Sequence, residues 1–279
     1  MYGYGYRYNS GLVIGAGGGK GASYLVDDFA PYIAYDLRKI SSTATNSIRV
    51  RRLSDNAEQD IGFNGDALDE SALATFCSGT DGFVTTFYDQ SGNSLNAVMV
   101  TASSQPRICL NGVIDSVNGK PAILGDGVND SLRVASLVGS LPNTQFALYD
   151  KVGTSGYFGS YGLTSSITGF GLGATGSRIY QNGAAFSPFS SLNTQALLMM
   201  KSTELTTSDW KFYENGNVII NNGEAIGTLA YNRVSLFDRP NNASRCNMYL
   251  QTYLLFNSDE SITNRVAIQD NINTYYSIY

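Results

Sequence analysis

After about residue 30, the chain consists mainly of short runs of alternating apolar and polar residues separated by turn residues. Ser47–Arg51 alternates in this way, and Phe83–Tyr88 is rich in β-branched and aromatic residues. The clearest hairpin pairs Trp210–Tyr213 with Val218–Ile220 across an Asn-Gly turn at 215–216, because Asn-Gly readily adopts the positive φ angles of a tight primed turn. Many short strands with turn signals roughly 8–12 residues apart are typical of an all-β sandwich.

Two segments follow a helical period instead. Glu70–Phe76 is compatible with a short helix, and Gly79 lies just beyond its end. The second segment is 259–276, which follows an expected N-cap at Ser258. Its apolar residues recur at helical spacing: Ile262, Val266, Ile272 and Tyr276. We expect this second helix to pack against the sandwich and close it.

The first 25 residues differ from the rest of the chain. Four tyrosines would share one face of an extended strand: Tyr2, Tyr4, Tyr6 and Tyr8. A run rich in glycine follows at 15–21 and would act as a flexible joint. We expect residues 1–25 to form an anchoring tail that docks onto a partner by strand addition, and residues 26–279 to form one β-sandwich domain. A disordered terminus and a first strand of the same domain are the alternatives.

The composition excludes several classes of function. The net charge of −5 argues against a nucleic-acid partner, because binding phosphates requires a basic face. Histidine, the commonest general base and metal ligand, does not occur. Cys77, Cys109 and Cys246 lack the spacing of a zinc site or a disulfide framework. No run approaches the roughly 20 apolar residues of a membrane span, and we expect no membrane partner and synthesis in a reducing cytoplasm.

Several groups of residues between positions 32 and 132 resemble a known family. They are Ala34–Lys39, Ile48–Arg52, Ser54–Asn56, Asp60–Phe63, Phe76-Cys77, Tyr88–Asn93 and Asn118–Ala122. Together they resemble the catalytic β-sandwich of α-L-arabinofuranosidase B, and more closely the non-enzymatic version of that module in phage tail-fibre and virion proteins. The resemblance implies an all-β, concanavalin- or laminin-G-like jelly-roll sandwich with a C-terminal helix.

The resemblance also implies where catalytic carboxyl groups would lie. A retaining enzyme needs two of them, about 5–5.5 Å apart. The family's nucleophilic glutamate lies in the middle of the module, but 157–180 contains no Asp or Glu here. Asp238 falls near the place of the acid/base, and Arg239 beside it would hold it ionised. The second cysteine expected near Cys77 is replaced at positions 80–81. We therefore expect no enzymatic activity, with Asp238 as the single catalytic candidate.

Aromatic and acidic residues of the expected loops supply the other candidates. Aromatic faces stack on sugar C–H surfaces, and four residues are expected to bind a glycan in this way: Trp210, Tyr157, Tyr161 and Tyr180. The candidate ligands for a Ca²⁺ ion, the one cofactor considered, are Asp89, Asp126 and Asp130. Asx turns that satisfy their own backbone amides are the alternative for these acids.

These features predict a non-enzymatic structural protein of a bacteriophage virion, in a tail fibre or as capsid decoration, that displays the sandwich for host attachment. The expected partners are other virion proteins, bound through the tail, and a host cell-surface glycan. We expect a homo-oligomer or many copies per particle, made in the bacterial cytoplasm and exposed on the virion surface. A stand-alone carbohydrate-binding module and an α-L-arabinofuranosidase are the alternatives.

Overall fold

A computed structural model of the chain describes residues 23–139, 142–153, 156–163, 166–173, 176–181, 184–186, 194–202, 211–220, 231–238 and 245–279. The predicted anchoring tail lies outside this part of the chain, apart from its last residues. Trp210 and Arg239 also lie outside it. None of the helices among the described residues is long and apolar enough to cross a membrane.

Strands make up most of the described chain. The helical elements are α1 Leu25–Phe29, α2 Glu70–Phe76, a 3-10 turn Ala102–Ser104 and α3 Ile262–Tyr276. The strands of the first half are β1 Ile33–Asp36, β2 Asn46–Arg52, β3 Glu58–Asn64, β4 Ala67–Leu68, β5 Gly82–Phe87, β6 Ala97–Val98, β7 Arg107–Leu110, β8 Val113–Ile114, β9 Ser116–Val117, β10 Lys120–Pro121, β11 Ile123–Asp126 and β12 Leu132–Gly139. Those of the second half are β13 Asn143–Lys151, β14 Gly156–Leu163, β15 Ser166–Gly173, β16 Gly176–Gln181, β17 Ala184–Phe186, β18 Ala196–Ser202, β19 Lys211–Glu214, β20 Asn217–Ile220, β21 Tyr231–Leu236 and β22 Asn247–Phe256.

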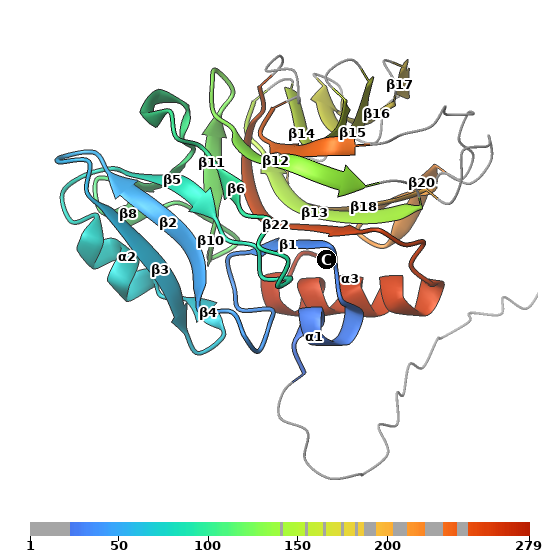
Figure 1. Ribbon diagram of the computed structural model, residues 1–279, viewed down its shortest axis with the longest axis horizontal. Coiled ribbons are helices and arrows are strands. Elements are labelled where there is room, and N and C mark those ends of the chain that lie inside the picture. Colours follow the sequence, from blue (N-terminus) through green and yellow to red (C-terminus); the bar gives the residue numbers. More distant parts are fainter. Residues whose placement is uncertain are drawn as a thin grey trace, which may run out of the picture.

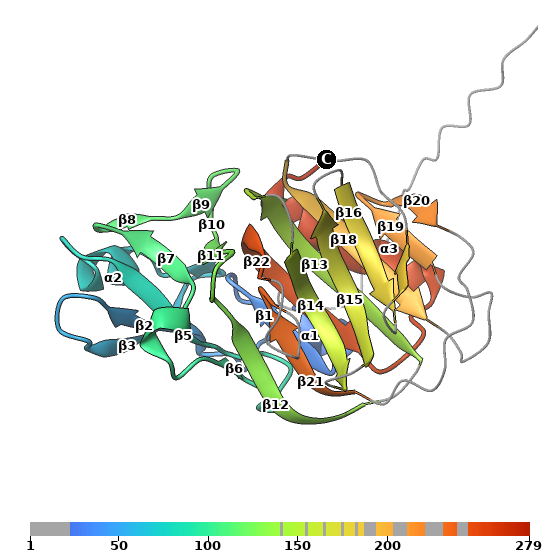
Figure 2. The same cartoon turned by 90° about the horizontal axis from the view of Figure 1, so that it is seen from above.

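Antiparallel pairing arranges these strands in layers. One series runs β3-β2-β5-β7-β11-β22-β13-β18-β19-β20, with β1 beside β22. A second series runs β12-β21-β14-β15-β16-β17, and β6 pairs with both β5 and β12. In Figure 1 the strands β14 to β17 lie on one side of β13, β18 and β22, and α3 lies on the other. Figure 2 shows β2, β3, β5, β7 and α2 grouped at one end of the molecule, with β11 and β12 between them and the larger sandwich.

The middle layer is buried on both faces. On β13, Ala147 and Tyr149 join the large core between the sheets, whereas Phe146 and Leu148 join a second core that includes residues of α3. Residues of one strand point alternately to opposite faces, so a strand covered on both sides is apolar at successive positions. This accounts for the nearly continuous apolar runs of β13, β18 and β22.

The predicted all-β sandwich with a C-terminal helix is confirmed at this level, and so are several of its elements. The helix Glu70–Phe76 occupies the predicted residues, and β2 and β5 agree with the predicted strands to within one residue at either end. The hairpin β19–β20 turns at Asn215, with a φ of 49°, and Gly216, with a φ of 77°. Both values suit the primed turn that the Asn-Gly pair predicts.

The C-terminal helix differs from its prediction in two ways. It begins three residues later than expected, because the Ser261 side chain accepts a hydrogen bond from the Asn264 amide at 3.1 Å and caps it. Its buried face also differs: Ile262 and Val266 are 68% and 49% exposed. The buried residues are Arg265, Ile268, Gln269, Ile272 and Tyr276. The predicted buried face was therefore only partly correct, because Arg265 and Gln269 are buried in place of Ile262 and Val266.

Candidate active-site cleft

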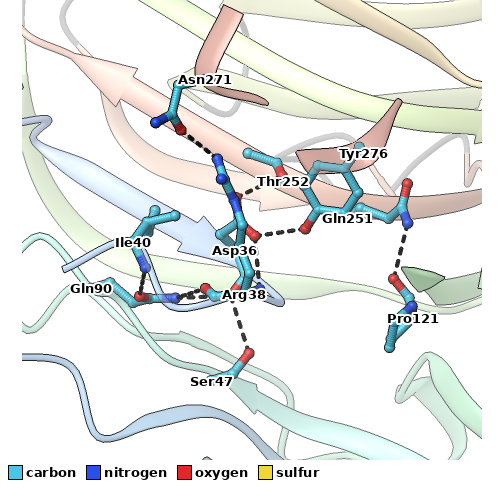
Figure 3. Close-up of polar contacts among 10 residues, drawn as sticks. All are labelled: Asp36, Arg38, Ile40, Ser47, Gln90, Pro121, Gln251, Thr252, Asn271 and Tyr276. Atoms are coloured by element: carbon cyan, nitrogen blue, oxygen red, sulfur yellow. Dashed lines mark hydrogen bonds and ion pairs between the residues drawn. The ribbon is translucent and has the colours of Figure 1, made fainter. Parts of the chain in front are cut away.

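Residues that carry the family resemblance form a buried polar frame rather than an open site (Figure 3). Asp36 is fully buried and accepts hydrogen bonds from the Arg38 amide at 2.8 Å, the Thr252 hydroxyl at 2.9 Å and the Tyr276 hydroxyl at 2.6 Å. Burial raises the pKa of Asp36, and the Arg38 guanidinium and these hydrogen bonds oppose that rise. Asp36 therefore ties β1 to β22 and α3.

Gln90, within the matching run Tyr88–Asn93, has a similar structural role. Its side-chain amide donates to the carbonyls of Asp36 and Arg38 at 2.8 and 2.9 Å and accepts from the Ile40 amide at 2.9 Å. Figure 3 shows these groups converging on the segment that follows β1. Asp36, Arg38 and Gln90, which carry part of the resemblance, therefore hold the chain in place.

Three hollows lined by described residues differ in chemistry. The largest, about 710 Å³, lies beside α2, and its one carboxyl group, Asp69, caps that helix. A second, about 520 Å³, also has a single carboxyl group, Asp150. The third, about 330 Å³, has three: Asp81, Asp126 and Asp130. Because acid–base chemistry on a glycosidic bond needs two carboxyl groups, the third hollow is the candidate active-site cleft despite its smaller volume.

The walls of this cleft are fixed by hydrogen bonds. Arg51 of β2 donates to the Gln105 side chain at 2.7 Å, and its guanidinium lies 5.2 Å from the ring centre of Phe83 on β5. Arg107 of β7 forms a two-pronged ion pair with Asp115 at 2.8 and 2.9 Å. Such constraints hold a site in one geometry before a ligand arrives.

The β11–β12 loop supplies two of the carboxyl groups. Asp126 is exposed, and its Oδ1 accepts from the Val128 amide at 2.7 Å. Asp130 is only 6% exposed, and its Oδ2 accepts from the Asp126 amide at 2.9 Å. Burial raises the pKa of Asp130 to about 6, and the Asp126 carboxyl adds to that rise. One carboxyl group that keeps its proton up to about pH 6 therefore lies in the same loop as one that faces solvent, as in enzymes that divide acid and nucleophile between two acids.

Asp238, the predicted catalytic candidate, is not among the residues that line this cleft. Its side chain is fully buried, accepts a hydrogen bond from Ser131 at 2.8 Å and forms ion pairs with Arg133 and with Arg245, the latter at 3.9 Å. Burial raises the pKa of Asp238, and Arg133, Ser131 and Arg245 each oppose that rise. Since Ser131 directly follows Asp130, this cluster anchors the end of the β11–β12 loop, which carries the cleft acid.

The predicted sugar-stacking tyrosines lie on neighbouring strands. Tyr157 and Tyr161 belong to β14 and Tyr180 to β16, on either side of β15. Their side chains are outside the described part of the chain, as is Trp210. The backbone thus brings the three tyrosine positions into one sheet.

The three candidate calcium ligands make turn hydrogen bonds. Asp89 accepts from the amides of Ala34, Ser91 and Leu95 at 2.9, 3.0 and 3.0 Å. Asp126 binds amides of its own loop in the same way. Among the described residues, no group of three or more His, Cys, Asp or Glu could hold a metal ion. The Asx-turn alternative therefore describes Asp89 and Asp126.

Comparisons with known proteins point to one class of enzyme. Residues 37–120 match the family model of the α-L-arabinofuranosidase B catalytic domain. No curated protein matches the chain. Among solved structures, an arabinofuranosidase complexed with arabinofuranosyl-α-1,2-xylobiose is similar with a TM-score of 0.69 and 16% identity, covering 87% of this chain and 62% of that one. A GH54 α-L-arabinofuranosidase soaked with a cyclic sulfate inhibitor is similar with a TM-score of 0.67 and 16% identity, covering 88% and 64%.

These findings correct the functional prediction. A non-enzymatic virion protein is contradicted, because the matching model is that of a catalytic domain and the similar structures are glycoside hydrolases. None of the comparisons reported above connects the chain with phage proteins, tail fibres or capsids. At 16% identity the structures establish a shared fold, and the chain spans about three fifths of the length of either one.

The sequence analysis considered the acids of the β11–β12 loop as metal ligands or as Asx-turn residues, and not as catalytic groups. The run Asp126-Gly-Val-Asn-Asp130 was the available signal, since it places two carboxyl groups in one short loop after a strand. The sequence alone does not show that Asp130 is buried, or that Arg51 and Arg107 of other strands line the same cleft.

Proposed function

We propose that the chain is the sandwich domain of a glycoside hydrolase that acts on α-L-arabinofuranosides. The match of residues 37–120 to the arabinofuranosidase B catalytic model carries this proposal. The fold shared with two arabinofuranosidases and the carboxyl-lined cleft support it. With the fold, we also propose the jelly-roll connectivity that the sequence resemblance implies.

In this proposal Asp130 is the proton donor and Asp126 the second carboxyl group. A pKa of about 6 leaves Asp130 protonated in a weakly acidic medium, as a general acid requires. Asp130 would protonate the leaving oxygen while Asp126 attacks the anomeric carbon, and water would then release the sugar. Backbone amides hold Oδ1 of Asp126, so the attack would come from Oδ2.

A cyclic sulfate of arabinofuranose tests this assignment, since the similar GH54 enzyme was soaked with a cyclic sulfate inhibitor. The full chain should gain the mass of one opened inhibitor, and peptide mapping should place that mass on Asp126. Asp126→Asn should remove the label, whereas Asp150→Asn, in a different hollow, should leave it unchanged. No label, or a label on an acid outside the cleft, would refute the assignment.

We further propose that Tyr157, Tyr161, Tyr180 and Trp210 bind more distant sugar units by stacking. Aromatic stacking on sugars adds affinity without taking part in bond cleavage. Trp210→Ala should therefore weaken binding of an arabinose-branched oligosaccharide while leaving hydrolysis of a single-sugar aryl arabinofuranoside unchanged. Equal affinity of the variant and the unaltered chain for the oligosaccharide would refute this role.

A further inference from the structure

Two of the three cysteines meet beside the strands that form the cleft. Cys77 is the C-cap residue of α2, and Cys109 lies on β7. Both are fully buried in the same hydrophobic core, and the Cys77 sulfur and the Cys109 Cβ both lie next to Gly82. Cys109 is also the cross-strand partner of Gly82 on β5. Residues far apart in the sequence therefore bring two sulfur atoms together.

Gly82 leaves the space that the two thiols share. A Cβ atom at this position would lie 2.5 Å from the Cys77 sulfur and 3.2 Å from the Cys109 Cβ. The first distance is shorter than an ordinary contact, so a side chain at this position would displace the Cys77 sulfur from its place beside β7. The family resemblance implies a second cysteine at 80–81, whereas the neighbouring cysteine of this chain lies on β7.

We propose that Cys77 and Cys109 form a disulfide when the protein meets a disulfide oxidant such as oxidised glutathione. Each thiol gives up its proton, and the two electrons reduce the S–S bond of the oxidant to two thiols. The new bond joins the end of α2 to β7 and closes a loop of about 30 residues. The inference is independent of the proposed function.

The position of the bond suggests what it would do. Gly82 lies between Asp81 and Phe83, and Cys109 lies two residues beyond Arg107; all three neighbours line the cleft. A covalent link between α2 and β7 would hold these walls together. Burial raises the pKa of Cys77 to about 12, so the exchange should be slow at neutral pH and faster in mildly alkaline buffer, where more thiolate forms.

Thiol counting on the full chain tests the proposal. After equilibration with oxidised glutathione, acid quenching and denaturation, one thiol should remain to be alkylated, and the intact mass should fall by two hydrogens. Peptide mapping should show a Cys77–Cys109 link. Cys246→Ser, which alters the third buried cysteine of the same core, should still form the link, and Cys77→Ala and Cys109→Ala should not.

A thermal unfolding scan gives a second measure of the disulfide that does not depend on alkylation of the remaining thiols. Oxidation should raise the melting temperature by several degrees in the unaltered chain and in Cys246→Ser, and leave it unchanged in Cys109→Ala. Three free thiols after equilibration, glutathione attached to single cysteines, or a link to Cys246 would overturn the proposal.

Discussion

Replacing Asp130 by asparagine should stabilise the protein at neutral pH. In the folded chain the pKa of Asp130 is about 6, against an ordinary value of 3.8. The folded state therefore binds this proton more tightly than the unfolded state does. The free energy of unfolding therefore falls as pH rises from about 4 to about 6. Above pH 6 the buried charge lowers it by roughly 3 kcal/mol relative to its value below pH 4.

Asparagine has the same shape, does not ionise, and keeps an oxygen for the hydrogen bond from the Asp126 amide. The free energy of unfolding of Asp130→Asn should therefore exceed that of the unaltered chain by roughly 2–3 kcal/mol at pH 7.5, and the difference should shrink toward zero near pH 4. Urea unfolding followed by fluorescence, at intervals between pH 4 and 7.5, measures both curves.

The control is Asp126→Asn, which removes the neighbouring carboxylate that contributes to the raised pKa of Asp130. This variant should keep the pH dependence but shift it to lower pH. Parallel curves for Asp130→Asn and the unaltered chain would show that Asp130 titrates normally, and would remove the reason for naming it the proton donor.

The other predictions concern buried polar groups that do not line the cleft. Tyr276→Phe removes the hydroxyl that donates to buried Asp36, and should lower the free energy of unfolding in urea by about 1–3 kcal/mol. Asp238→Ala removes the buried acceptor of the Ser131 hydroxyl, and should cost about 1–3 kcal/mol in the same assay. Unchanged unfolding midpoints would contradict the structural role assigned to either residue.

Elements that depend on neighbouring residues could be predicted from the sequence. The Asn-Gly pair fixed the turn of β19–β20, and the short helix Glu70–Phe76 formed where the sequence predicted it, with Asp69 accepting from the Ala72 amide as its cap. The buried face of α3 was not predictable in this way. Arg265 packs its guanidinium 5.2 Å from the ring centre of Tyr213, and no helical periodicity of apolar residues anticipates a buried arginine.

The site was harder to predict because its chemistry arises from contacts between distant segments. Asp130 is an ordinary loop acid in the sequence, and only the fold buries it. The expectation of a non-enzymatic protein assumed that a nucleophile must come from 157–180. Acids on the β11–β12 loop were not weighed for that role, although the fold places them in a cleft with two arginines.

Hydrolysis of 4-nitrophenyl α-L-arabinofuranoside by the purified full chain tests the central claim most directly. We predict nitrophenol release that declines as pH rises above about 6, where Asp130 loses its proton. Asp130→Asn should reduce kcat by on the order of 10²–10⁴-fold, whereas Asp150→Asn, which alters a carboxyl group of another hollow, should keep full activity. No release by the unaltered chain would contradict the proposed function, and full activity of Asp130→Asn would contradict the proposed site.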